Sequence, residues 1–184
     1  CWLFTGLNVL RAKMIARHDM SRFEFSQNFC SFYDLLEKSN LFLQAIIDTR
    51  ALPLDNREVD WLLRNPIGDG GQFTGVSNLV MKYGVVPKEV MPETYQSEHT
   101  LYMRNILKLK LREGALLLRG AKSDAVAAKL KGDMLIEIYR ILVECLGEPP
   151  TEFEWSMYDK QGNLVSTKTY TPKSFYEEYL GEDL

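Results

Sequence analysis

The sequence is poor in histidine and cysteine. Its 184 residues include only two histidines, His18 and His99, and three cysteines, Cys1, Cys30 and Cys145. An odd number of widely spaced cysteines does not suit a disulfide framework, so a reducing, cytoplasmic setting is expected. No two cysteines lie at metal-ligand spacing, and the histidines are too few to complete a ligand set. We therefore expect no metal site and no cofactor.

An excess of positive charge is also missing. The formal net charge is -3, whereas nucleic-acid binding usually requires a basic patch or stripe. The basic residues of segment 108–112 alternate with leucines and are expected to form a solvated helix face. No uninterrupted apolar stretch reaches the roughly 18 to 20 residues of a membrane span, and no signal peptide is visible. Neither a nucleic acid nor a membrane is therefore an expected partner.

Apolar periodicity and end signals instead predict a mainly helical chain followed by a β-hairpin. A long helix is expected to begin at Ser97, with Leu101, Ile106, Leu109 and Leu116 among its apolar residues. A turn at 159–162 separates the two expected strands. Helices are predicted over residues 2 to about 17, 26 to about 47, 73–83, 97–119 and 123–146, with a short helix around Val59 that ends before Asn65 and a last helix from Pro172 through Tyr179. The strands are predicted over 152–157 and 163–170.

Cys1 stands at the beginning of the first predicted helix. The dipole and free amides of a first helical turn favour a thiolate over a thiol, so this position suits a nucleophile. The plain alternative is a small core residue, because buried structural cysteines are common. Cys30, within the second predicted helix, is interpreted in that second way.

The residues around Cys1 resemble a known family. Cys-Trp-Leu-Phe-Thr leading into a helix is similar to the nucleophile segment of papain-like cysteine peptidases, whose signature ends in cysteine followed by tryptophan or tyrosine. The upstream half of that signature would precede residue 1. Three later segments are similar to the bleomycin hydrolase and aminopeptidase C branch of these peptidases: Phe25–Phe29, Gly68–Phe73, and Tyr83–Lys88 with Met91–Thr94.

The resemblance implies roles for five positions. Cys1 would attack the peptide carbonyl, and its own backbone amide would donate half of the oxyanion hole. Gly70 and Gly71 would pair with the main chain of a bound peptide. Asp69 and Trp2 complete the expected substrate-binding positions. Asp69 stands where secreted relatives have a disulfide cysteine, and Trp2 would lie beside the nucleophile.

The same resemblance implies further catalytic groups that this sequence does not supply. Relatives use a glutamine a few residues upstream of the cysteine, and a histidine and an asparagine that follow the cysteine by about 130 to 150 residues in papain. No histidine follows residue 99. His18 would lie about 25 Å from the helix start at 1.5 Å per residue, too far to act on Cys1. We therefore expect a truncated, inactive chain.

The predicted fold class is α+β: the mainly helical, nucleophile-bearing half of a papain-like fold, with a helical insertion and a β-hairpin. The expected domains are 1–94, the helical papain-like part; 95–150, the insertion; and 151–184, the hairpin and a short helix. The resemblance implies an aminopeptidase that removes N-terminal residues from peptides, in the cytoplasm, as a homo-oligomer, namely a hexamer with inward-facing sites.

Two alternatives stay open. An N-terminal cysteine can belong to an N-terminal nucleophile amidohydrolase, in which the α-amine of the cysteine is the base. Such enzymes normally open on a β-strand, whereas Cys1 precedes a predicted helix. The chain could also be a non-catalytic helical interaction module, in which the glycines of segment 68–71 serve only the geometry of a turn.

Overall fold

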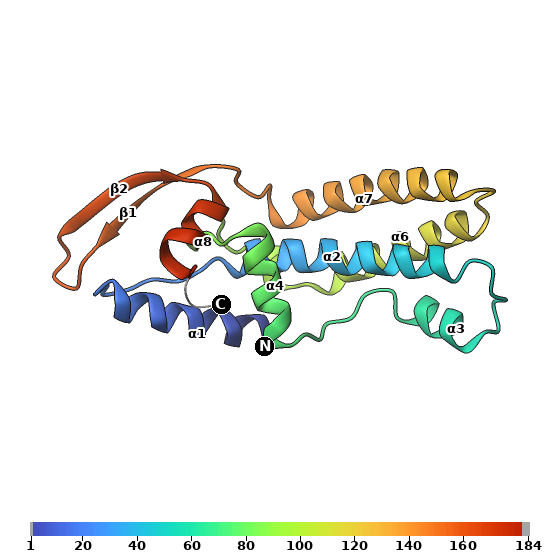
Figure 1. Ribbon diagram of the computed structural model, residues 1–184, viewed down its shortest axis with the longest axis horizontal. Helices are drawn as coiled ribbons and strands as arrows, with labels where there is room; N and C mark the ends of the chain where they lie inside the picture. The colour runs from blue at the N-terminus through green and yellow to red at the C-terminus, as the bar shows by residue number, and fades with distance from the viewer. Residues whose placement is uncertain (1, 182–184) are drawn as a thin grey trace. The chain divides into compact units, whose positions relative to one another are not determined.

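The computed structural model describes residues 2–181, which form eight helices and one two-stranded antiparallel sheet (Figure 1). This combination confirms a mainly helical chain with a β-hairpin. The helices and strands are α1 (Trp2–Arg17), α2 (Gln27–Asp48), α3 (Arg57–Arg64), α4 (Phe73–Tyr83), α5 (Tyr95–Glu98), α6 (Leu101–Arg119), α7 (Asp124–Leu146), β1 (Phe153–Tyr158), β2 (Leu164–Tyr170) and α8 (Pro172–Leu180).

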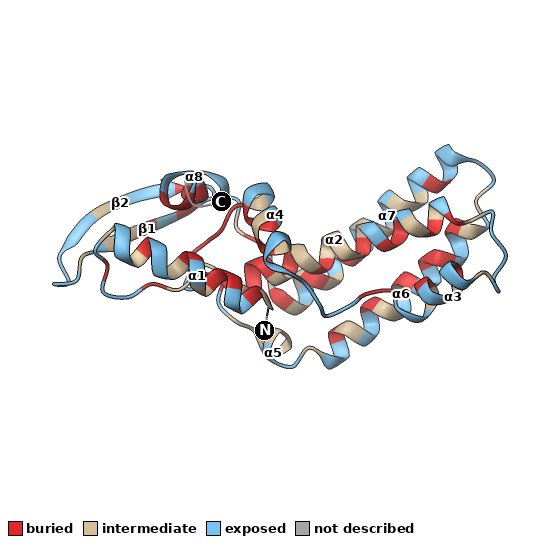
Figure 2. Cartoon of the chain, turned by 60° about the horizontal axis from the view of Figure 1, so that its bottom comes forward, coloured by how far each residue is buried: buried red, intermediate tan, exposed pale blue. Residues whose placement is uncertain are grey.

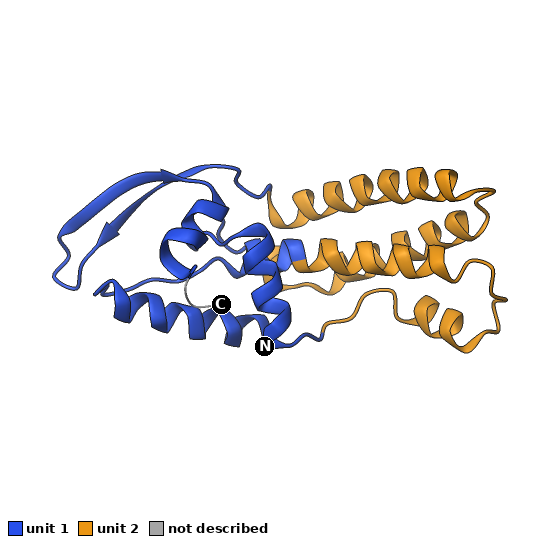
Figure 3. Cartoon of the chain, in the orientation of Figure 1, with its two compact units in different colours: residues 1–33, 70–94, 148–184 blue, residues 34–69, 95–147 orange. Residues whose placement is uncertain are grey.

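The chain divides into two compact units (Figure 3). The first unit combines residues 1–33, 70–94 and 148–184, and the second, which we call the helical unit, combines residues 34–69 and 95–147. Each unit is therefore assembled from segments that are distant in the sequence. The division into 1–94, 95–150 and 151–184 stays a prediction.

Helix ends follow local sequence signals. The side chains of Asn56, Ser123 and Thr171 accept hydrogen bonds from backbone amides at the starts of α3, α7 and α8. These bonds satisfy donors that a helix leaves unpaired in its first turn. Gly84 and Gly147 follow α4 and α7 with φ angles of 80° and 88°, which residues with a side chain rarely adopt.

The expected start of the long helix at Ser97 is wrong. Ser97 lies inside the short α5, and α6 begins at Leu101 after Thr100. The buried face of α6 is formed by Met103, Leu107, Leu111, Gly114, Ala115 and Leu118. The apolar residues that the sequence suggested for this helix, Leu101, Ile106, Leu109 and Leu116, are all exposed. Figure 2 shows both buried and exposed residues along α6.

The core of the helical unit lies among α6, α7 and the part of α2 that belongs to this unit. A side chain at Gly114 would lie 2.7 Å from the sulfur of Met134 and 3.4 Å from Leu43. The glycine therefore lets α6 approach both neighbours closely. Leu107, Leu118 and Leu142 are fully buried, as expected for an interior packed at crystal-like density.

The core of the first unit is a set of aromatic rings around Phe175 of α8. The Phe175 ring lies 5.2 Å from the rings of both Trp155 and Tyr170, which come from the two strands, and both pairs meet edge to face. Phe23, from the segment after α1, stacks at 6.2 Å. Such pairs add about 0.5–1.5 kcal/mol each beyond the burial of area, so α8 holds the hairpin to the rest of the unit.

Two of the segments that carry the family resemblance are bonded to each other. The Ser26 hydroxyl accepts from the backbone amide of Phe29 at the start of α2 and donates to the carbonyl of Met91 at 2.5 Å. The Asn28 amide donates to the carbonyl of Pro92 at 2.8 Å. These residues therefore hold the loop that follows α4, and their role in the fold is structural.

We expect Gly84→Ala to destabilise the protein more than Gly147→Ala. Both glycines have positive φ, and strain of this kind costs roughly 1–3 kcal/mol. At Gly84 an added side chain would also lie 2.1 Å from the backbone oxygen of Pro172, whereas at Gly147 it would meet nothing within 4 Å. Overpacking should add about another 1–3 kcal/mol at Gly84, measurable by urea unfolding. Equal losses in the two variants would contradict the close contact.

Candidate active site

The first turn of α1 lies against the glycine turn before α4. A side chain at Gly71 would come within 2.4 Å of the Trp2 indole, and one at Gly75 within 3.3 Å. The indole therefore occupies space that only a glycine at residue 71 leaves open. The structure thus brings together two of the predicted site positions, Trp2 and Gly71, from parts of the chain about 70 residues apart.

A second close contact fixes α1 against α4. A side chain at Gly6 would lie 2.6 Å from a methyl carbon of Val76, which is completely buried. Leu3, Leu7, Leu10 and Met14 continue the buried face of α1. The start of α1 is therefore positioned by apolar packing along the helix as well as by Trp2.

Cys1, the predicted nucleophile, lies outside the described residues. Its neighbour Trp2 begins α1, a helix of 16 residues with no acidic side chain in its first turn. No carboxylate of the first turn therefore offsets the positive end of the helix dipole. A helix start of this kind favours an anion.

The other two thiols have environments that disfavour a thiolate. Cys30 is buried in α2, as the sequence analysis expected. Burial, and then the negative charge of Glu144, raise the pKa of the Cys145 thiol. Neither cysteine has the electropositive, accessible surroundings of a reactive thiol.

Gly70 and Asp69, the remaining predicted site residues, are both exposed. A side chain at Gly70 would meet no atom within 4 Å, so its backbone is uncovered and a bound chain has room to approach it. The Asp69 carboxylate belongs to the helical unit, where Arg104 of α6 donates to it at 2.5 Å. Sequence reasoning missed Arg104, because no local pattern links two residues 35 positions apart.

Neither histidine of this sequence is arranged as a base for the site. The Nε2 atom of His18 is buried and has no hydrogen-bond partner among residues 2–181, and its ring packs edge to face on Tyr179 at 4.9 Å. His99 is in the helical unit, where its ring stacks on Tyr95 at 4.3 Å. Both rings have structural contacts.

Within residues 2–181, no group of three or more histidine, cysteine, aspartate or glutamate side chains is placed to hold a metal ion. In the same part of the chain, no helix is both long and apolar enough to cross a membrane.

The chain belongs to the Peptidase C1-like family, which it matches over residues 1–184. It is 43% identical to aminopeptidase C from Listeria monocytogenes over its whole length, and 41% identical to human bleomycin hydrolase over 98% of its length. The crystal structure of PepW from Lactobacillus rhamnosis superposes with a TM-score of 0.95 at 42% identity and covers all of this chain.

The chain is shorter than these relatives. It spans 42% of the Listeria aminopeptidase C, 41% of human bleomycin hydrolase and 42% of the PepW chain.

The family match, the identities and the structural superposition confirm the resemblance to the aminopeptidase C and bleomycin hydrolase branch and the papain-like fold class.

We expect Gly71→Ala to disturb the contact with Trp2. The new methyl group would lie 2.4 Å from the indole, which must move together with the first turn of α1. Overpacking of this kind costs typically about 1–3 kcal/mol of unfolding free energy. Urea unfolding and near-ultraviolet circular dichroism measure the loss and the change around the tryptophan. Gly68→Ala is the control, because a side chain there meets nothing within 4 Å; similar losses in both variants would refute the contact.

We also expect His18 to make the folded state less stable in acid. Burial, and then the charge of Arg17, lower the pKa of His18 despite the opposing charge of Glu178. The unfolded chain therefore binds this proton more readily, so stability falls as the pH drops below about 6.5. Unfolding measured from pH 8 to pH 5 should show a smaller loss in His18→Phe than in the unaltered protein. The same pH slope in both proteins would refute the proposed role.

Proposed function

We propose that the protein containing this chain is a cysteine aminopeptidase that removes N-terminal residues from peptides, with Cys1 as the nucleophile. The observation that carries the proposal is the packing of Trp2, the residue after Cys1, against Gly71 of the glycine turn. Trp2 thereby lies beside the glycine turn, and the 43% identity to an aminopeptidase C supports the assignment of the preceding residue, Cys1, as the nucleophile.

In the proposed reaction, the start of α1 supplies the nucleophile and the glycine turn binds the peptide. The Cys1 thiolate attacks the scissile carbonyl carbon, and the backbone amide of Cys1 donates to the developing oxyanion. Gly70, whose backbone is uncovered, and Gly71, on which Trp2 packs, pair with the peptide main chain, and Asp69 precedes them in the sequence. The adduct then collapses: the C–N bond breaks, the departing amine takes the proton held by the histidine base, and the acyl group stays on Cys1 as a thioester. Water hydrolyses this thioester to release the N-terminal residue.

Residues 1–184 do not supply the base for this reaction. A papain-like mechanism needs a histidine near the nucleophile, and both histidines of this sequence have other contacts: His18 with Tyr179, and His99 with Tyr95. We therefore assign the base, its orienting asparagine and the second oxyanion donor to chain outside these residues. Residues 1–184 alone should consequently be inactive.

We propose further that the protein is a cytoplasmic homo-oligomer, a hexamer by family resemblance. The odd number and wide spacing of the three cysteines support a reducing compartment. Exposed apolar side chains on α6, among them Tyr102 and Leu116, support association, because contiguous apolar surface commonly marks a protein interface.

Alkylation tests the nucleophile directly. In the protein expressed from its complete coding sequence, a peptide-like epoxide should label Cys1 at least about tenfold faster than Cys30 or Cys145, because a thiolate is the reactive form. Peptide mapping by mass spectrometry after timed exposure gives the three rates. Cys1→Ser should abolish both the fast labelling and the release of amino acid from an aminoacyl-amide substrate.

Unfolding in urea is the control, since it should bring the three labelling rates close together. Equal, slow labelling of all three cysteines in the folded protein would instead favour a non-catalytic helical module. Fast labelling of Cys1 without aminopeptidase activity would refute the substrate class but not the nucleophile.

A further inference from the structure

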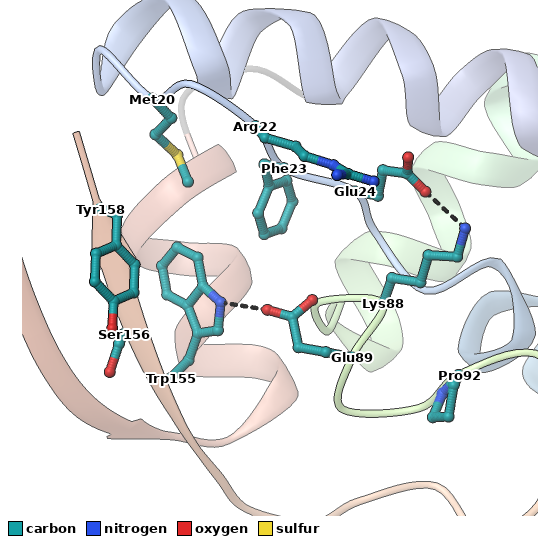
Figure 4. Close-up of a pocket in the computed structure, with 10 residues that line it drawn as sticks. All are labelled: Met20, Arg22, Phe23, Glu24, Lys88, Glu89, Pro92, Trp155, Ser156 and Tyr158. Carbon is teal, nitrogen blue, oxygen red and sulfur yellow. Dashed lines mark hydrogen bonds and ion pairs between the residues drawn. The ribbon is translucent and has the colours of Figure 1, made fainter. Parts of the chain in front are cut away.

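The first unit contains a pocket whose lining includes none of the predicted site residues. Its cavity volume is about 480 Å³, within the roughly 300–1,000 Å³ of common ligand pockets. Three segments build it: the stretch after α1, the loop after α4, and β1 (Figure 4). Nothing in the proposed aminopeptidase reaction requires this second pocket.

Aromatic rings form the floor of the pocket. Phe23 and Trp155 are 5% and 7% exposed, and their rings meet edge to face at 5.6 Å. Trp155 also packs edge to face on Phe175 in the core at 5.2 Å. The floor is therefore held by the packing of the first unit and is already formed without a ligand. It offers an apolar contact surface to a ligand side chain.

Glu89 provides an oriented negative charge on one wall. The indole nitrogen of Trp155 donates to one carboxylate oxygen at 2.9 Å (Figure 4), which fixes the side chain against the floor. No lysine or arginine among residues 2–181 forms an ion pair with Glu89. Its second carboxylate oxygen is therefore available to a cationic donor.

The remaining charges of the pocket are those of Lys88, Glu24 and Arg22. Lys88 donates to Glu24 at 2.7 Å, so these two charges offset each other. Arg22 lies on the same side of the pocket, close enough for its charge to act on the Glu24 carboxylate, but its guanidinium forms no direct ion pair within the described part of the chain (Figure 4). The pocket thus presents one anion and one cation beside an apolar floor.

From this combination we propose that the pocket binds a free α-amino acid with an apolar side chain. Glu89 accepts from the ammonium group, Arg22 donates to the carboxylate, and the side chain lies on Phe23 and Trp155. A zwitterion satisfies both charges at once, whereas a simple anion would face Glu89 and a simple cation would face Arg22. A guanidinium suits a carboxylate because it can donate two parallel hydrogen bonds.

The proposed aminopeptidase would itself release amino acids of this kind, but the binding claim does not rest on turnover. The test is therefore a binding measurement on the protein expressed from its complete coding sequence. Incorporated 5-fluorotryptophan gives separate fluorine NMR signals for Trp155, in the pocket, and Trp2, at the candidate active site. Tryptophan-to-phenylalanine variants assign the two signals.

Added L-leucine should shift the Trp155 signal saturably. N-acetyl-L-leucine, which lacks the ammonium group, and L-leucinol, which lacks the carboxylate, should each bind at least about tenfold more weakly, equivalent to about 1.4 kcal/mol. Glu89→Gln and Arg22→Gln should weaken leucine binding by at least the same factor. The glutamine at 89 can still accept the indole hydrogen bond, so the fold is preserved while the charge is lost.

Glu154→Gln is the matched control, because Glu154 is an exposed β1 carboxylate outside the pocket lining. The affinity of this variant for leucine should be unchanged. Three results would overturn the proposal. One is a Trp2 shift without a Trp155 shift, which would place leucine at the active site. The others are equal binding of leucine and its two analogues, and unchanged leucine binding in both Glu89→Gln and Arg22→Gln.

Discussion

The candidate active site depends on residue 71 being a glycine, which has no side chain. The Trp2 indole fills the space beside that backbone, and Gly6 accepts Val76 in the same manner further along α1. Both contacts are apolar and close, so water does not compete with them as it competes with surface hydrogen bonds. The start of α1 is therefore positioned by shape complementarity. Under the proposed function this matters, because small displacements of reacting groups lower the rate steeply.

Most helix ends and the hairpin could be predicted from the sequence, because their signals are local. A capping side chain such as Asn56, Ser123 or Thr171 acts on amides two or three residues away, and Gly84 and Gly147 act at their own positions. The family resemblance could also be predicted from the sequence, because each of its segments is an uninterrupted stretch of residues. The bonds from Ser26 and Asn28 to the loop after α4 give two of these segments a common structural role.

Other features depend on partners that the sequence does not indicate. Apolar residues occur around much of α6, so periodicity alone does not tell that Leu107 and Leu111 are buried while Ile106 and Leu109 face solvent. Ser97 and Thr100 are both plausible helix starts, and tertiary context selects the later one. The hydrogen bond from Trp155 to Glu89 joins residues 66 positions apart. Sequence reasoning therefore did not indicate the pocket that Trp155 and Glu89 line.

The discontinuous composition of the first unit affects how the chain acquires its structure during synthesis. Residues 1–33 are made before the helical unit, yet the ring of Phe23 packs on Trp155 and Phe175, which are made after the whole helical unit. Domains of nascent chains fold as they emerge, and contacts distant in sequence form slowly. The helical unit, residues 34–69 and 95–147, can therefore fold before Phe23 has its aromatic partners. Residues 1–33 therefore precede the helical unit in synthesis and complete their packing after it.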